Sequence, residues 1–188
     1  MVNEEIIRAY QFLKKGSIIL YPTDTIWGLG CDATNLAAVN RIFAIKRRPP
    51  QKSFIILLDE VEKLPLYIDP IPTIAWDLIE QATRPTTFIY KNVKNLPSKL
   101  IASDGTIAIR IVQDEFCKKL INLLGSPLVS TSANITGTPT PLSFKEISQE
   151  IINKVDYVVD PTSAIVKDAK PSTIIRFIDN YSFEVVRE

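Results

Sequence analysis

Short apolar runs alternate with amphipathic segments along the whole chain, and this alternation limits the possible folds more than any other feature. Apolar residues at helical spacing predict helices over 4–14, 35–46, 72–81 and 114–124. Runs rich in apolar and β-branched residues predict strands over 17–21, 54–58, 87–90, 106–112, 128–132, 157–159, 173–178 and 183–186, the last two joined as a hairpin. Intermingled helices and strands together with a hairpin favour an α/β fold: a single domain over residues 1–188, with a twisted mixed sheet flanked by helices.

Polar residues and glycines mark where the expected helices begin and end. Asn35 or Thr34 caps the second helix, and Asp114 caps a helix that Gly125 ends. A capping box, Ser143-Phe-Lys-Glu146, opens a further helix. The side chains of the second helix that we expect to face the core are Leu36, Val39, Ile42 and Phe43.

The chain has no histidine, which removes Ser-His-Asp catalysis, Cys-His catalysis and histidine-based metal sites. Cys31 and Cys117 lie far apart without metal-binding spacing, so we expect both to be small core residues. The net charge of +1 argues against binding polyanions by bulk electrostatics. No apolar run approaches the roughly 20 residues that span a membrane. The N-terminal stretch has no signal-peptide pattern, and we therefore expect a cytoplasmic protein.

The stretch YPTDTIWGLG, residues 21–30, ends an apolar run with two hydroxyls, a carboxylate and a pair of glycines. In an extended chain Thr23 and Thr25 point to the same side, where their hydroxyls can bind a small polar ligand. The same residues also suit an ordinary turn in which the side chains cap the backbone. The local sequence favours the turn and leaves both interpretations open.

A basic stretch, AIKRRPPQKSF at residues 44–54, follows the second helix. Lys46 stands at the helix end, and Arg48 is pushed toward an extended conformation by the proline after it. The two cations can then face one side and hold a phosphate chain, lysine as a point charge and arginine as a fork, while Arg47 points away. The more common alternative is that these cations complement the helix dipole and face water.

The segment PLVSTSANITG, residues 127–137, runs from an apolar strand into hydroxyls and an amide. Ser130 and Ser132 share a face, and small hydroxyls with exposed backbone N–H groups at a strand end suit phosphate or ribose oxygens. A plain polar loop is the alternative.

In an α/β sheet, loops at the same ends of neighbouring strands line one crevice, so we expect the three segments to meet there. Hydroxyls, cations and amides without histidine fit a site for a nucleotide and a carboxylate better than a hydrolase site.

Five motifs in this order resemble the YrdC family, the threonylcarbamoyl-AMP synthases. They are PTDTIWGLG, KRRP at a helix end, TIAIR, STSANITG and PSTI, within a resemblance that extends from Gly16 to Arg187. The resemblance implies an enzyme of the nucleotidyltransferase type. It would form threonylcarbamoyl-AMP and pyrophosphate from L-threonine, bicarbonate or CO₂ and ATP, the first step of tRNA threonylcarbamoyladenosine modification. It also implies Mg²⁺ carried in with ATP, no metal site in the protein itself, and a downstream complex that modifies tRNA.

The resemblance also implies which residues form the site. Lys46 and Arg48 would be catalytic. The residues expected to bind L-threonine are Thr23, Thr25, Arg110 and Ser172. Those expected to bind the nucleotide are Lys46, Arg48, Lys52, Thr106, Ser130, Ser132, Asn134, Thr140 and Arg187. Lys52 and Leu57 stand where many members have asparagine and histidine.

A second function uses the same basic crevice: an RNA-binding or ribosome-associated module in which the cations from Lys46 to Lys52 contact phosphates. The near-zero net charge and the few aromatic residues placed for stacking favour a small-molecule site.

In the enzyme that the resemblance implies, the amine of threonine would capture CO₂, and the new carboxylate would attack the α-phosphorus of ATP. No general base is evident from the sequence.

Overall fold

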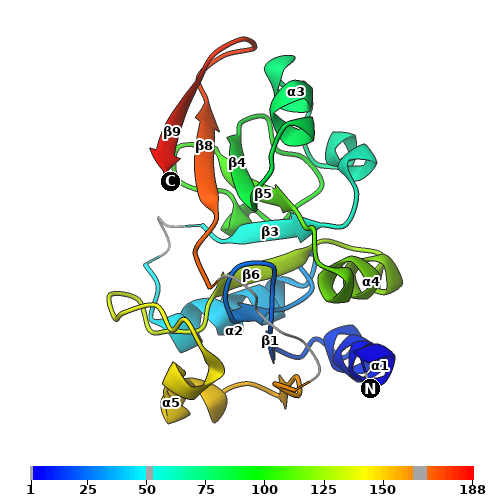
Figure 1. Ribbon diagram of the computed structural model, residues 1–188, viewed down its shortest axis with the longest axis vertical. Coiled ribbons are helices and arrows are strands. Elements are labelled where there is room, and N and C mark those ends of the chain that lie inside the picture. The colour runs from blue at the N-terminus through cyan, green and yellow to red at the C-terminus, as the bar shows by residue number, and fades with distance from the viewer. Residues whose placement is uncertain (1, 50–52, 163–168) are drawn as a thin grey trace.

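The computed structural model describes residues 2–49, 53–162 and 169–188. Figure 1 shows the strands crossing the middle of the molecule, with α1 and α4 together on one side and α2 and α5 below. The helices are α1 (Val2–Lys14), α2 (Leu36–Lys46), α3 (Ile74–Glu80), α4 (Glu115–Leu124) and α5 (Gln149–Ile152), with short 3₁₀ turns at Val61–Leu66, Ser98–Leu100 and Phe144–Glu146. The strands are β1 (Ile19–Tyr21), β2 (Gly28–Gly30), β3 (Ile55–Leu58), β4 (Thr86–Tyr90), β5 (Ile107–Ile111), β6 (Leu128–Ser132), β7 (Tyr157–Val158), β8 (Thr173–Phe177) and β9 (Phe183–Arg187).

These strands form one sheet in the order β7-β1-β2-β6-β3-β5-β4-β8-β9. The pairs β1–β7, β3–β5 and β4–β8 run parallel, and the other neighbours run antiparallel. The predicted mixed α/β sheet is therefore confirmed. β8 and β9 form the predicted hairpin, which reaches the top of the molecule in Figure 1.

The predicted helix caps hold the ends of α2 and α4. The Asn35 side chain accepts a hydrogen bond from the backbone N–H of Ala38, and that of Asp114 accepts one from Cys117. Gly125 ends α4 with a φ of 73°, the left-handed conformation that favours glycine. Local hydrogen bonds of this kind depend on few neighbours, so the sequence predicts them well.

Two local predictions were wrong. Leu36 is 51% exposed because the buried side of α2 begins only at Ala38. In the predicted capping box, Ser143 does donate to Glu146 at 2.7 Å, but the segment makes a single 3₁₀ turn. The helix that follows, α5, has Ser148 as its own cap.

β2 was not predicted, because glycine has little preference for strands. It lies between β1 and β6, and Gly30 is its critical residue. A Cβ atom added there would lie 2.5 Å from Cε1 of Tyr21 and 2.7 Å from the carbonyl oxygen of Val129. Gly30 therefore lets the Tyr21 ring and β6 come together across β2.

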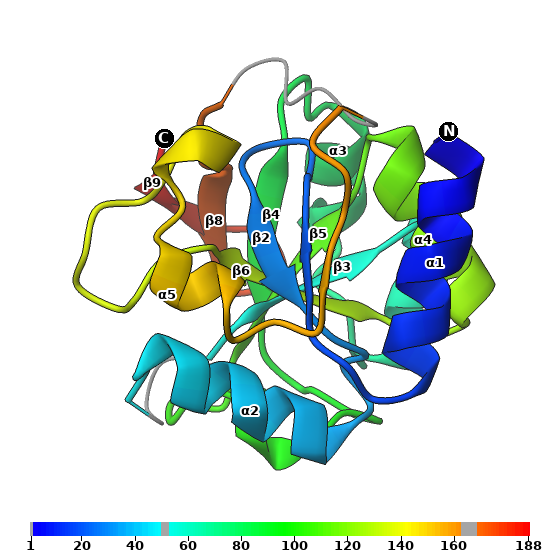
Figure 2. The same cartoon turned by 90° about the horizontal axis from the view of Figure 1, so that it is seen from below.

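One face of the sheet is fully packed, and the other is packed only in part. The packed face carries α2 and α3 and the larger hydrophobic core, to which Leu29, Ile56 and Ile109 contribute. On the other face, α1 and α4 cover β1, β3 and β6, where Tyr21 and Leu57 are buried in a second core. Figure 2 shows α1 and α4 side by side, with α2 elsewhere. α1 and α4 leave the rest of this face uncovered.

The two cysteines are buried, one in each core, which confirms their predicted role as core residues. Burial raises the pKa of both thiols, so neither is poised to react. Among the helices of the described residues, none combines the length and the apolar character needed to cross a membrane.

Gly30→Ala should destabilise the protein strongly, because the added methyl group meets an aromatic ring and a backbone carbonyl that hold β1 and β6 in place. We expect the free energy of unfolding, measured with urea, to fall by roughly 1–3 kcal/mol or more. Gly28→Ala is the matched control, since its nearest contacts would be 3.3 Å from Ser130 Oγ and 3.4 Å from the Thr131 oxygen. Equal losses for the two variants would contradict this account of Gly30.

Candidate functional site

A cavity of about 480 Å³ opens on the partly covered face of the sheet. Its floor consists of alternate residues of successive strands: Gly28, Ser130, Ser132, Ile55, Ala108, Arg110, Ile89, Ile174, Arg176 and Arg187. The cavity therefore lies over the face of the sheet, which corrects the prediction of a crevice at the strand ends. The reason is that α1 and α4 stop short of β4, β8 and β9, so the side chains on this face stay accessible.

The strand register places an apolar row across the floor. Ser130 pairs with Ile55, Ile55 with Ala108, Ala108 with Ile89, and Ile89 with Arg176. Three apolar side chains thus lie between a hydroxyl and a guanidinium. This row offers a flat apolar surface within a cavity whose remaining walls are mostly polar.

Thr23 and Thr25 both line the cavity and are buried, with their hydroxyl oxygens 2.9 Å apart. The Thr23 hydroxyl donates to the carbonyl oxygen of Ile26 at 2.7 Å, so the proton shared by the two threonines comes from Thr25. The Thr25 oxygen then has lone pairs left over. It can accept a hydrogen bond from the hydroxyl or ammonium group of a ligand.

Arg110 is buried in the cavity wall, with its side chain 3% exposed and its Nη2 atom 3.0 Å from Oδ1 of Asp24. This ion pair is not aligned as a hydrogen bond. Among the described residues, Nε and Nη2 of Arg110 and Oδ1 of Asp24 have no hydrogen-bond partner. Buried polar groups are normally satisfied, and the arginine fork matches a carboxylate. Because Arg110 also lines the cavity, its guanidinium can bind an anionic group of a ligand there.

A second guanidinium lies near Arg110. Arg187 donates to the carbonyl oxygen of Ser172 from Nε at 3.0 Å and from Nη2 at 2.7 Å, while the Ser172 hydroxyl is 2.8 Å from that of Thr87. Burial, and then the charge of Arg110, lower the pKa of Arg187. The two guanidiniums are close enough to repel each other, and the Asp24 carboxylate offsets part of the charge of Arg110.

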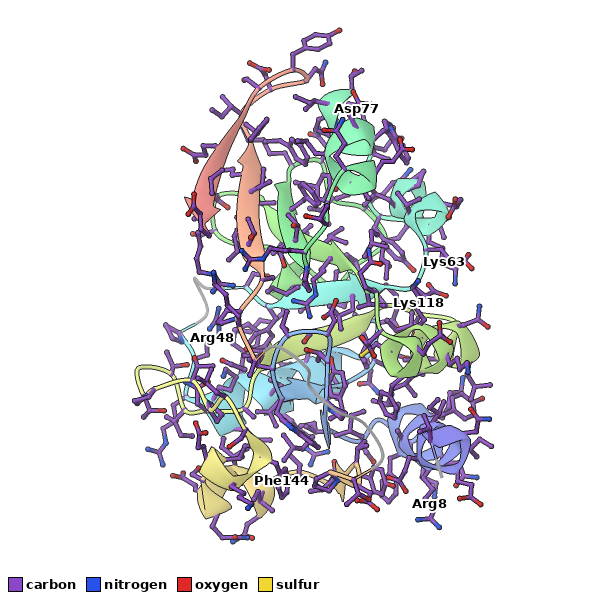
Figure 3. The ribbon with its side chains drawn as sticks, in the orientation of Figure 1. Arg8, Arg48, Lys63, Asp77, Lys118 and Phe144 are labelled. Carbon is purple, nitrogen blue, oxygen red and sulfur yellow. The ribbon has the colours of Figure 1, made fainter. Side chains whose placement is uncertain are left out.

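Arg48 lines the cavity beside the start of β3. Its Nη2 atom donates to the Ser53 carbonyl oxygen at 2.7 Å, and its guanidinium lies 5.2 Å from the centre of the Phe54 ring. Figure 3 shows Arg48 on the opposite side of the molecule from Lys118 of α4. Arg47 takes the left-handed conformation, with a φ of 50°, and pairs with Glu150 at 2.7 Å. The structure thus places Arg48 at the cavity and Arg47 away from it.

Lys46 lies behind the cavity wall and is 1% exposed. Its Nζ atom donates to the carbonyl oxygens of Ser132 at 2.6 Å and Asn134 at 2.7 Å. Burial, and then the charge of Arg48, lower the pKa of Lys46 to about 7. A neutral amine still has the two N–H groups that these carbonyls need. Lys46 thereby ties the end of α2 to the loop after β6, whichever protonation state it has.

The other residues that the sequence analysis named lie in four different places. Thr106, Ser130, Ser132 and Thr140 line the cavity. Asn134 lies behind Ser132: its Oδ1 accepts from the Ser132 hydroxyl at 2.6 Å and its Nδ2 donates to the Thr138 carbonyl at 2.7 Å. Lys52 falls outside the described residues, and Leu57 belongs to the core under α1 and α4.

Sequence reasoning missed Ser53, Phe54, Ser103, Asp104 and Arg176, which also line the cavity. Arg176 gave a usable signal, because a cation between two apolar residues of a strand faces away from the core. Asp104 gave less, because an Asp-Gly pair before a strand first suggests a turn. Asp104 is the one carboxylate among the described residues that line the cavity.

Over the described residues, no group of three or more histidine, cysteine or acidic side chains could hold a metal ion. With one carboxylate in its lining, the cavity fits a metal that arrives bound to a ligand better than a metal held by the protein.

Lys46 should make the stability of the protein depend on pH. Its folded pKa of about 7 is below that of an unfolded lysine, so between about pH 7 and 10 the unfolded chain binds the extra proton and the native state gains stability as the pH rises. Relative to Lys46→Met, the unmodified protein should gain about 2 kcal/mol in free energy of unfolding between about pH 7 and 9. Urea unfolding of both proteins measures this difference, in which other titrating groups cancel. Parallel pH profiles would contradict the lowered pKa.

Comparison with known proteins finds relatives over nearly the whole chain. A sequence model of the Sua5/YciO/YrdC family, described as telomere recombination, matches residues 11–188. A threonylcarbamoyl-AMP synthase of Pseudoalteromonas translucida is 37% identical over 173 residues, which cover 90% of this chain and 91% of that protein. One of Vibrio cholerae is 30% identical over 182 residues, with 92% of this chain and 97% of that protein covered.

Solved structures with a similar fold include two that bear the names of this family. Sua5 of P. abyssi in complex with L-threonine has a TM-score of 0.84 and 27% identity, covering 100% of this chain and 54% of that one. YciO of E. coli has a TM-score of 0.84 and 29% identity, covering 97% of this chain and 88% of that one. The chain thus spans about half the length of the P. abyssi protein and most of the length of the E. coli protein.

Proposed function

This chain belongs to the Sua5/YciO/YrdC family, and we propose that it catalyses the reaction for which its curated relatives are named. It forms threonylcarbamoyl-AMP and pyrophosphate from L-threonine, bicarbonate or CO₂ and ATP, the first step of tRNA threonylcarbamoyladenosine modification. The transfer of an adenylyl group makes it a nucleotidyltransferase.

The observation that carries this proposal is Arg110, a buried arginine in the cavity wall whose planar guanidinium matches a carboxylate. L-Threonine supplies that carboxylate, and its ammonium or hydroxyl group can donate to the free lone pairs of Thr25. Thr23 holds Thr25 in place, and the Ser172 hydroxyl lies in the same part of the cavity.

The rest of the cavity suits ATP. Arg48 supplies a fork for phosphate oxygens, and Thr106, Ser130, Ser132, Thr140 and Arg187 supply further polar groups for the nucleotide. Lys46 and Asn134 support the wall that carries Ser132. When a phosphate chain comes close, its negative charge raises the pKa of Lys46, and the buried amine becomes a full cation.

The chemistry needs no covalent intermediate with the protein. The amine of threonine bonds to the carbon of CO₂ and loses a proton, which gives N-carboxy-threonine. The new carboxylate then attacks the α-phosphorus of ATP, and the bond to pyrophosphate breaks. This chain contributes by holding the two substrates in line and by stabilising the phosphate charge with fixed cations.

Mg²⁺ enters with the phosphates of ATP in this proposal, since the described residues contain no protein metal cluster. It would neutralise phosphate charge when bound. The product is a mixed anhydride, so a downstream complex must consume it by transferring the threonylcarbamoyl group to tRNA. Direct RNA contact and a cytoplasmic location remain predictions, and a purely RNA-binding role is not favoured by relatives that are named as synthases.

The test is pyrophosphate release by the purified protein with ATP, L-threonine and bicarbonate. We expect release to require all three, and valine to give a kcat/KM lower by roughly 100-fold or more, because it leaves buried polar groups unpaired. Serine, which keeps the hydroxyl, should be the closer competitor. Equal turnover with valine would contradict the threonine site, and salt-dependent RNA binding without turnover would support the RNA-binding module instead.

Arg48→Ala should lower turnover by roughly 100-fold or more, the scale seen when a donor to developing charge is deleted. Arg47→Ala is the matched control, because it removes an exposed pair with Glu150 worth about 1 kcal/mol or less. Arg48→Lys should rescue only in part, since a point charge cannot replace a fork. Pyrophosphate release and melting temperature are measured for all three variants. Similar losses for Arg47→Ala and Arg48→Ala at unchanged stability would mean that the basic stretch acts only as diffuse charge.

A further inference from the structure

Asp104 brings a negative charge into a cavity whose other charged lining residues are arginines. One of its oxygens is already occupied: Oδ1 accepts from the backbone N–H of Thr106 at 3.1 Å and from the Thr106 hydroxyl at 2.6 Å. The other, Oδ2, lies 3.7 Å from Nη1 of Arg176, an ion pair that is too long to be a hydrogen bond. Oδ2 can therefore accept a hydrogen bond from a ligand.

The charges around Asp104 restrict which ligand group this is. A phosphate would be repelled by the carboxylate, so the triphosphate of ATP must point elsewhere, toward Arg48 and the wall formed by Ser132. A divalent cation would meet the positive charge of Arg176 next to the only free oxygen. A neutral donor such as a hydroxyl group fits both neighbours.

The apolar row places such a donor near Asp104. The row of Ile55, Ala108 and Ile89 ends at Arg176, the residue beside Asp104 Oδ2. A nucleobase that lies on this row with its ribose at the Arg176 end would bring the ribose hydroxyls close to Asp104. A carboxylate that accepts from a ribose hydroxyl is a common device in nucleotide sites.

We propose that Asp104 accepts a hydrogen bond from a ribose hydroxyl of ATP and thereby makes the enzyme select ribonucleotides over deoxyribonucleotides. This inference rests on the proposed function for the identity of the nucleotide. Asp104 acts on the choice of substrate and not on the reacting atoms. Its effect should therefore appear in the ratio of the kcat/KM value for ATP to that for a deoxy analogue.

The experiment compares ATP, 2′-deoxy-ATP and 3′-deoxy-ATP in pyrophosphate release. We expect the unmodified protein to prefer ATP over at least one deoxy analogue by about 10- to 100-fold, the scale of a hydrogen bond to a charged group. Asp104→Ala should reduce this preference to about 3-fold or less, because kcat/KM falls for ATP and stays nearly constant for that analogue.

Two further variants separate this role from a structural one. Asp104→Asn keeps an oxygen for the Thr106 N–H group but loses the charge, so it should retain the turn and lose part of the preference. Asp179→Asn changes an acid that caps a turn in the same way, accepting from the backbone of Tyr181 and Ser182 at the tip of the β8–β9 hairpin. It should leave the preference unchanged.

An unmodified protein that does not discriminate, or an Asp104→Ala variant that slows all three nucleotides equally, would overturn the proposal. A higher Mg²⁺ requirement in that variant with an unchanged preference would also overturn it, by assigning the carboxylate to the metal. Calorimetric binding of ATP and the deoxy analogues without threonine separates the two proposals. If binding shows a ribose preference that depends on Asp104 but the protein releases no pyrophosphate, the proposed function is contradicted and this inference still holds.

Discussion

Each strand beneath the cavity has one face in a hydrophobic core and the other face in the cavity, and the rest of the structure depends on that constraint. In β5, Ile107 and Ile109 lie in the larger core, while Ala108 and Arg110 line the cavity. Because side chains alternate along a strand, a slip of one residue would bury Arg110 among apolar groups and expose the isoleucines. The free-energy cost of that slip holds β5 in register with β3 and β4. It thereby also sets where Arg110 lies in the cavity wall.

Much of the fold and of the composition of the site could be predicted from the sequence, because the signals involved are local. Asn35 and Asp114 cap their helices through hydrogen bonds to residues three positions away. The alternation along β5, where isoleucines at 107, 109 and 111 enclose Ala108 and Arg110, is visible without any partner. The three polar segments do converge, since Thr25, Arg48 and Ser132 line one cavity. Their convergence follows from the order of the strands in a mixed sheet.

The parts that could not be predicted depend on contacts between distant segments. Whether a strand face is core or cavity is decided by how far α1 and α4 reach across it, and no local pattern encodes that limit. Lys46 was expected to face a phosphate chain, and the structure instead ties its ammonium group to carbonyls 86 and 88 residues away. Gly30 carries no strand signal, because its role is to lack a side chain that Tyr21 and Val129 would meet. Asp104 was not predicted as a cavity residue, because the sequence around it is typical of the turn that it also forms.

The cavity gathers positive charge, because four arginines line it: Arg48, Arg110, Arg176 and Arg187. Lys46 and Arg187 both have lowered pKa values, because each is buried and each lies near another cation. Asp24 and Asp104 offset part of the positive charge around the cavity, and the rest is a free-energy cost that is met when the protein folds. In the proposed function, a carboxylate at Arg110 and a phosphate chain near Arg48 would relieve this cost on binding. Adenylyl transfer to a carboxylate needs fixed positive charge and alignment more than it needs a side chain that exchanges protons. The arginines of the cavity wall keep their charge at neutral pH, whereas Lys46 behind the wall, with a pKa of about 7, is fully charged there only when a phosphate chain raises that pKa.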